Sequence, residues 1–211
     1  MTYDKLDNDE LLRIALDAIN QDRHADAVSM LKTMDETRKL AEIRFNAVNA
    51  TAADVVGPVD GGFKTLSETI DRGKVALAAE MMGSAQKVME MTVEYAKVRE
   101  QFGRPIGSFQ AIQHKCADML VDVESAKSAT YYAAWAMSNE VAESKLAGAL
   151  AKAAASDACR RTTAAGIQLH GGIGFTWEHD MHLYFKRAKS SEFTFGDATY
   201  NREIVAQLIG L

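Results

Sequence analysis

The sequence predicts a mainly α protein built on an antiparallel, up-and-down bundle of long helices, preceded by a helical hairpin and a short β segment. Alanine is abundant and only two prolines occur, a combination that favours long helices because alanine has the best helix propensity and proline the worst. From about residue 63 onward, apolar residues recur at helical spacing in long segments that tight connections separate. Such connections place successive helices antiparallel.

Residues 1–34 predict the helical hairpin. Asp7 or Asn8 can cap a first helix, because a side-chain oxygen accepts hydrogen bonds from the free N–H groups of the first turn. After a break at Gln21-Asp22, the apolar run Ala25–Leu31 predicts a second, short helix. The pair resembles one unit of a helical-repeat adaptor, but no second copy follows, which argues against a repeat array.

Residues 35–62 change in character. Within Leu40–Phe45, apolar residues partly alternate, which is the spacing of a strand. The following stretch, 46–60, mixes Asn, Thr, Asp, Gly and Pro, and Gly61-Gly62 acts as a breaker. We therefore expect a short β segment that leads into a linker.

Residues 63–211 predict the bundle. A first helix spans about 65–100, and a second begins at Ser108 as its N-cap and ends near Asn139. A third spans about Ser144 to His170 and stops at Gly171-Gly172, because glycine readily adopts the backbone conformation that ends a helix.

A glycine- and aromatic-containing loop, 171–178, follows the third helix. Two shorter helices complete the chain, at about 181–191 and 198–209. Asp197 is expected to cap the last of them.

Composition excludes several classes of protein. The net charge of −5 argues against a nucleic-acid partner, which would require a basic face. The sequence contains no run of about 18 apolar residues, so it predicts no membrane span. The polar segment 1–9 lacks the apolar core of a signal peptide. Cys116 and Cys159 match no metal-binding spacing. We therefore expect a cytoplasmic protein with no metal and no membrane partner.

Three clusters of residues carry a family resemblance. The first is Tyr95–Gln110, with an Arg, a Phe-Gly pair and a Gln that begins the next helix; the others are Gln168–Phe175, with its Gly-Gly-x-Gly segment, and Tyr184–Lys189. In this order and spacing they resemble the C-terminal helical domain of the acyl-CoA dehydrogenase family. The resemblance covers about Met34 to the end, and it implies that 35–62 is the remnant of the family's middle β domain.

The resemblance also implies FAD as cofactor and five candidate binding residues: Arg99, Phe102, Gln110, Gln168 and Gly172. An arginine can grip a pyrophosphate through its planar fork, a phenylalanine can pack on a ring system, and glycine lets a ligand approach the backbone. Each has an ordinary alternative. Arg99 can be a cation that is favourable at a helix C-terminus, Phe102 a core aromatic residue, Gln110 and Gln168 surface amides, and Gly172 a helix C-cap. Their joint order favours the flavin.

The family's catalytic carboxylate is absent from both positions where the resemblance places it. The reaction removes a proton next to a thioester carbonyl, and a carboxylate whose pKa is tuned by burial acts as base. Phe195 stands at the usual glutamate position, and Gly73 stands at the alternative one. Glu80 and Glu192 are weak substitutes, for which ion pairing is the better expectation.

The resemblance predicts an FAD-dependent acyl-CoA dehydrogenase-like protein, truncated or base-less, that acts on an acyl-CoA thioester. The expected partner is a second subunit, in a homo- or hetero-oligomer with another acyl-CoA dehydrogenase chain. The alternative is a catalytically silent helical assembly module that retains only the oligomerisation bundle. Uptake of FAD separates the two.

Overall fold

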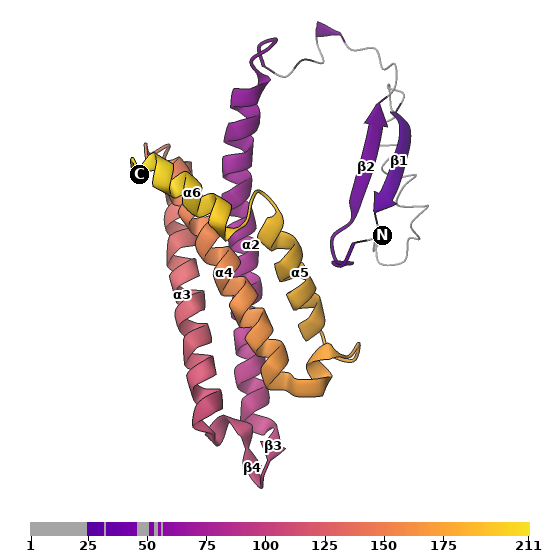
Figure 1. The fold of residues 1–211 in the computed structure, drawn as a ribbon, viewed down its shortest axis with the longest axis vertical. Coiled ribbons are helices and arrows are strands. Elements are labelled where there is room, and N and C mark those ends of the chain that lie inside the picture. Colours follow the sequence, from indigo (N-terminus) through magenta and orange to yellow (C-terminus); the bar gives the residue numbers. More distant parts are fainter. Residues whose placement is uncertain (1–24, 32, 46–50, 53–54, 56) are drawn as a thin grey trace. The chain divides into compact units, whose positions relative to one another are not determined.

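The computed structural model describes residues 25–31, 33–45, 51–52, 55 and 57–211 (Figure 1). The chain divides into two units, Met1–Phe63 and Lys64–Leu211, and each is described by itself. The first helix of the expected N-terminal hairpin lies outside the described residues.

The described part of the first unit is a β-hairpin. Strand β1, Ala25–Leu31, pairs antiparallel with strand β2, Leu40–Phe45. The register joins Leu31 to Leu40 and Val28 to Ile43. The strand expected at Leu40–Phe45 is therefore confirmed.

The second helix of the expected hairpin is wrong, because Ala25–Leu31 is a strand. A seven-residue run is too short to repay helix nucleation, and β2 supplies its backbone groups with hydrogen-bond partners along most of its length. Asp35 organises the connection, since its Oδ1 accepts a hydrogen bond from the Thr37 backbone N–H at 3.0 Å and its carbonyl accepts one from Thr33 Oγ1 at 2.8 Å. This local bonding favours a turn over a helix.

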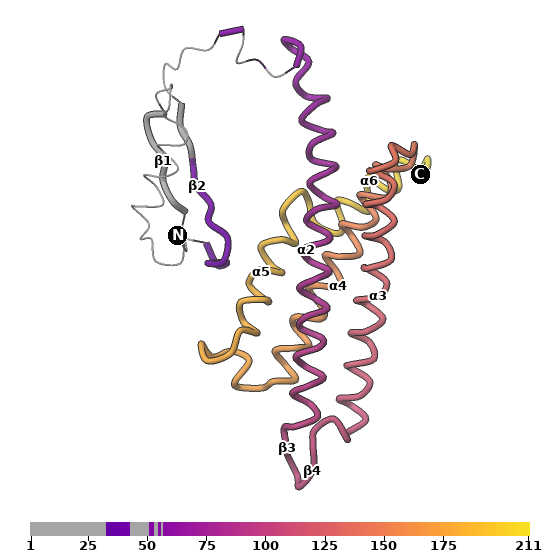
Figure 2. Tube along the Cα trace, turned by 180° about the vertical axis from the view of Figure 1, so that it is seen from behind, coloured from indigo at the N-terminus to yellow at the C-terminus, as the bar shows by residue number. Residues whose placement is uncertain are grey.

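The second unit confirms the antiparallel helical bundle. Its long helices are α2, Gly62–Val98, α3, Gln110–Ser138, and α4, Ser144–His170. Figures 1 and 2 show them side by side from opposite directions. The shorter helices α5, Met181–Phe193, and α6, Ala198–Leu208, pack against α4.

The core of the bundle is rich in alanine. Small side chains allow helices to approach closely, and Gly148 of α4 shows how closely: a Cβ there would lie 3.3 Å from Met137 Cε and 3.4 Å from Val75 Cγ2. The three long helices all contribute to one buried cluster. Its members include Val75, Ala78, Met81, Val123, Ala133, Ala151, Ala155 and Cys159.

Some helix ends agree with the sequence prediction and one does not. Helix α4 has the expected bounds and ends at Gly171 with φ of 65°. Asp197 caps α6 as expected, because its Oδ1 accepts a hydrogen bond from the Tyr200 N–H at 2.8 Å. The expectation that Ser108 caps the second helix is wrong: Ser108 lies in a 3₁₀ turn, Ile106–Ser108 (η3), and donates instead to the Pro105 carbonyl at 2.7 Å.

Candidate functional site

A tight hairpin that the sequence did not predict joins α2 to η3. Strands β3, Glu100–Gln101, and β4, Arg104–Pro105, are connected by Phe102 and Gly103, whose φ angles are 55° and 78°. Two successive positive φ angles are typical of a two-residue hairpin turn. A bulky residue at positive φ is a rare, strained choice.

Phe102 presents its ring to solvent, with 91% of the residue exposed. The ring meets Phe109 edge to face at 6.1 Å between centroids. It lines an open cavity of about 450 Å³ together with Phe109, Lys115, Gln168 and Leu169. Of the five flavin candidates, the structure therefore brings Phe102 and Gln168 together, although they come from distant parts of the sequence.

The other three flavin candidates do not line this cavity. Arg99 is exposed just after α2, where its carbonyl accepts a hydrogen bond from the Ile106 N–H at 2.8 Å. Gln110 is the exposed first residue of α3. Gly172 is exposed in the 3₁₀ segment η4, Gly171–Phe175, and a Cβ there would meet nothing within 4 Å. The space beside Gly172 is thus open to a ligand or a second chain.

An aromatic stack supports the end of α4. The rings of Tyr95 and His170 lie parallel at 4.4 Å, and His179 lies 4.7 Å from His170. His170 Nδ1 bonds to the Gly166 carbonyl at 2.8 Å, and burial lowers the pKa of His170. Sequence reasoning missed this support, because its partners come from three elements.

The chemical types of the side chains that line this cavity suit part of a flavin nucleotide. The cavity offers the ring of Phe102, an ammonium group on Lys115 and the amide of Gln168. Rings, cations and amides suit the stacking surface and the phosphates of a dinucleotide. The cavity is open to solvent on one side, so these residues form one wall of a site and not an enclosed pocket.

Gly73 and Phe195, the two positions that lack the carboxylate, lie against each other. A Cβ on Gly73 would be 3.0 Å from both Cε2 and Cζ of Phe195. The glycine therefore makes room for the ring. The residue Phe195 is 40% exposed, so its ring forms a wall beside α2.

Phe195 lies in a turn that normally requires glycine. The Gly196 N–H donates to the Phe193 carbonyl at 3.1 Å, Thr194 has φ −66° and ψ 127°, and Phe195 has φ 59°. These values describe a type II turn, whose third position favours glycine or asparagine. The strained residue is also the one at the expected base position, and such strain clusters at functional sites.

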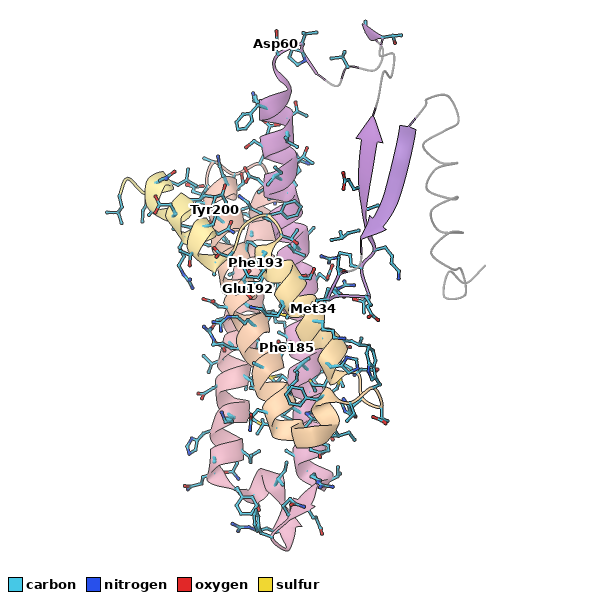
Figure 3. The ribbon with its side chains drawn as sticks, turned by 45° about the vertical axis from the view of Figure 1, so that its right-hand side comes forward. Met34, Asp60, Phe185, Glu192, Phe193 and Tyr200 are labelled. Carbon is cyan, nitrogen blue, oxygen red and sulfur yellow. The ribbon has the colours of Figure 1, made fainter. Side chains whose placement is uncertain are left out.

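A buried lysine holds this turn. Lys152 of α4 is 0% exposed, and its Nζ donates to the carbonyls of Glu192 at 3.0 Å and Gly196 at 2.9 Å, and to Ser156 Oγ at 2.8 Å. Asn201 Nδ2 donates to the same Gly196 carbonyl at 2.9 Å. Figure 3 shows Glu192 and Phe193 at the end of α5 and Tyr200 at the start of α6, on either side of the turn.

The pKa of Lys152 is lowered to about 8, mainly by burial and to a smaller extent by the nearby Lys74, whereas Glu192 and Asp197 oppose the shift. Sequence reasoning missed Lys152. Its only signal was a lysine in an alanine-rich helical run, and its carbonyl partners are about forty residues further along the chain.

The two substitute carboxylates are paired, as expected. Glu80 Oε1 lies 2.8 Å from Arg187 Nη1. Glu192 Oε2 lies 2.5 Å from Lys189 Nζ, and its Oε1 lies 3.7 Å from Arg160 Nε. Each carboxylate thus has a cationic partner within the chain, as the ion-pairing expectation required.

Other kinds of site are not found among the residues that the structure describes. No cluster of three or more His, Cys, Asp or Glu side chains could hold a metal ion there. Within the same residues, every helix is too short or too polar to cross a membrane.

Comparisons with known proteins agree with this geometry. A family model for the acyl-CoA dehydrogenase C-terminal domain matches residues 60–210. The chain is 44% identical over 159 residues to the acyl-CoA dehydrogenase IpdE2 of Mycobacterium tuberculosis, covering 75% of this chain and 44% of that protein.

Solved structures give the same result. Butyryl-CoA dehydrogenase from Megasphaera elsdenii matches with a TM-score of 0.82 and 30% identity, over 86% of this chain and 47% of that one. The ChsE4–ChsE5 complex of Mycobacterium tuberculosis matches with a TM-score of 0.78 and 32% identity, over 88% and 49%. The chain thus spans about half the length of the relatives it matches.

Proposed function

Since the chain belongs to the acyl-CoA dehydrogenase family, we propose that it is a flavin-binding, base-less part of an FAD-dependent acyl-CoA dehydrogenase. It supplies the helical scaffold and one side of the flavin site, and a second chain supplies the carboxylate. The substrate class is an acyl-CoA thioester.

The contact between Gly73 and Phe195 carries the base-less part of the proposal. The two positions where the family resemblance places the base are in contact, because a Cβ on Gly73 would lie 3.0 Å from the Phe195 ring, and neither carries a carboxylate. A hydrocarbon ring cannot accept the proton. Glu80 and Glu192 are engaged with cations, which supports neither as a replacement.

The cavity beside Phe102 supports flavin binding. Phe102 and Gln168 line it, and Lys115 adds a positive charge. The exposed Arg99 precedes Phe102 in the sequence, and the exposed Gln110 follows Phe109. When bound, FAD supplies the hydride acceptor for α,β-dehydrogenation of the thioester. This chain's residues would hold the cofactor and exclude water from one side of it.

A second subunit is part of the proposal. The ChsE4–ChsE5 match is a complex of two different chains. In this chain, α3 exposes Tyr131, Tyr132 and Trp135, and exposed aromatic residues are enriched at protein interfaces. We therefore propose a homo- or hetero-oligomer with another acyl-CoA dehydrogenase chain.

The decisive experiment titrates the purified chain with FAD, followed by flavin absorbance and fluorescence, and then adds butyryl-CoA. We expect FAD uptake without bleaching of the flavin. Phe102→Ala is expected to weaken uptake about tenfold, a typical loss for removing an aromatic contact. Phe63→Ala is the matched control, because Phe63 is also an exposed phenylalanine and does not line the cavity.

Each part of the proposal can fail separately. Bleaching by butyryl-CoA in the chain alone would show that it has a working base. Absence of FAD uptake, alone or with an acyl-CoA dehydrogenase partner, would instead support the alternative of a silent helical assembly module.

A further inference from the structure

We infer that Lys152 is a positioning residue, whose buried ammonium group holds the turn after α5 so that the ring of Phe195 lies over Gly73. The inference rests on the proposed function only in placing that ring at the expected position of the base. The contacts themselves belong to this chain.

The buried ammonium group of Lys152 has a hydrogen-bond partner for each of its donors. A lysine that is 0% exposed loses the hydration of its charge, and such a residue is retained where its hydrogen bonds are fully used. An ammonium group has three N–H donors. All three are matched, by Ser156 Oγ and by the carbonyls of Glu192 and Gly196.

The two carbonyls define the turn. Glu192 precedes the turn and Gly196 closes it, so a single Nζ atom fixes both ends of the segment that carries Phe195. Hydrogen bonds from an ammonium group are about twice as strong as those between neutral groups. The clamp therefore can hold a phenylalanine where a type II turn normally needs glycine.

Ring position follows from the turn. The ring of Phe195 packs on α2 at Gly73, whereas Lys152 belongs to a different helix, α4. The three donors of Lys152 Nζ go to Ser156, Glu192 and Gly196, so its influence on the ring passes through the turn. This makes the α4 lysine a determinant of how the space beside α2 is filled.

The charges that shift the pKa of Lys152 come from three other parts of the chain. Glu192 of α5 and Asp197, before α6, favour the charged form, and Lys74 of α2 opposes it. Burial is the largest influence, and it lowers the pKa of Lys152 to about 8. Titration of this one group gives the clamp a measurable signature.

The first test measures amide hydrogen exchange of the full chain at neutral pH. Lys152→Met keeps an unbranched side chain, one heavy atom shorter, and removes all three donors. We expect exchange at residues 193–197 to rise at least about tenfold, since each charge-assisted bond is worth that much or more, while the core of α3 is unchanged. Lys145→Met is the matched control, because Lys145 is an exposed lysine of the same helix.

The second test follows the Phe195 ring in a fluorophenylalanine-labelled chain, with its resonance assigned by its loss in Phe195→Leu. In the wild type we expect this resonance to shift with a midpoint near pH 8. Lys152→Met should displace the resonance and abolish the pH step. Ser156→Ala, which keeps the lysine, should retain the step with faster exchange at 193–197.

Exchange at 193–197 or a Phe195 resonance that is unchanged in Lys152→Met would overturn the inference. If Lys152→Met does not fold, Ser156→Ala decides it, because exchange at 193–197 that stays at the wild-type rate in this variant would overturn the inference as well. Neither test uses FAD or acyl-CoA. A failure here therefore leaves the proposed flavin function standing, and a chain that binds no flavin leaves this inference standing.

Discussion

The pairing of Gly73 with Phe195 can be measured as a coupling energy. Gly73 lies inside α2, where replacing glycine by alanine normally stabilises a helix by about 1 kcal/mol. Here the new Cβ would lie 3.0 Å from two atoms of the Phe195 ring, and overpacking costs about 1–3 kcal/mol. We expect Gly73→Ala to leave the free energy of unfolding unchanged or to lower it by up to about 2 kcal/mol.

Removing the ring should reverse the sign. In a Phe195→Ala background the Cβ of residue 73 has room, so Gly73→Ala should raise the free energy of unfolding by about 1 kcal/mol. Urea unfolding of the four chains, followed by circular dichroism, gives a coupling of about 1–3 kcal/mol. Since the chain has two units, the bundle transition must be fitted by itself.

Gly83→Ala supplies the control within the same helix. A Cβ on Gly83 would meet nothing within 4 Å. It should therefore stabilise the bundle by about 1 kcal/mol in both backgrounds. A Gly73→Ala change that stabilises both backgrounds equally, with coupling below about 0.5 kcal/mol, would refute the claim that the glycine exists to admit the ring.

Three further predictions follow from buried groups. Burial raises the pKa of the Cys159 thiol to about 12, so a thiol reagent at pH 8 should label Cys116 in the folded chain and label Cys159 only after unfolding; early labelling of Cys159 would contradict its burial. Gly166→Ala should lower the free energy of unfolding by about 1–3 kcal/mol, because its Cβ would lie 2.7 Å from Val88 Cγ1; urea unfolding unchanged from the wild type would count against this packing. The pKa of Lys152 is lowered from 10.5 to about 8, so between these values the unfolded chain binds more protons and the free energy of unfolding rises with pH, by up to about 3 kcal/mol; a Lys152→Met chain with the same rise would assign it to other groups.

The bundle was predictable because its signals are local. Alanine content and helical spacing gave α4 its bounds, with Gly171 at its end, and Asp197 capped α6 as its type and place indicated. Ala25–Leu31 failed because a seven-residue apolar run fits a helix or a strand. Its partner strand, β2, decided between them, and pairing is a tertiary property.

The candidate site was predictable only in its parts. Phe102 and Gln168 were selected one by one, and the cavity that joins them depends on how α3 and α4 pack. Phe195 and Gly73 were recognised as positions without a carboxylate, whereas their contact could not be read from residues so far apart. Lys152 gave no local signal, since its bonds go to backbone carbonyls that any residue could supply.

Backbone strain links the two regions. Four described residues other than glycine have positive φ, and two of them, Phe102 and Phe195, are the aromatic residues at the candidate flavin position and at the expected base position. Each such conformation costs on the order of 1–3 kcal/mol, and glycine would remove that cost at either place. A ring must therefore be worth more there than the strain it brings. At Phe195 the structure shows what offsets the strain. Lys152 of α4 and Asn201 of α6 both donate hydrogen bonds to the Gly196 carbonyl, and Gly73 of α2 leaves room for the ring. Side chains from two helices therefore hold the turn that places the ring against a third.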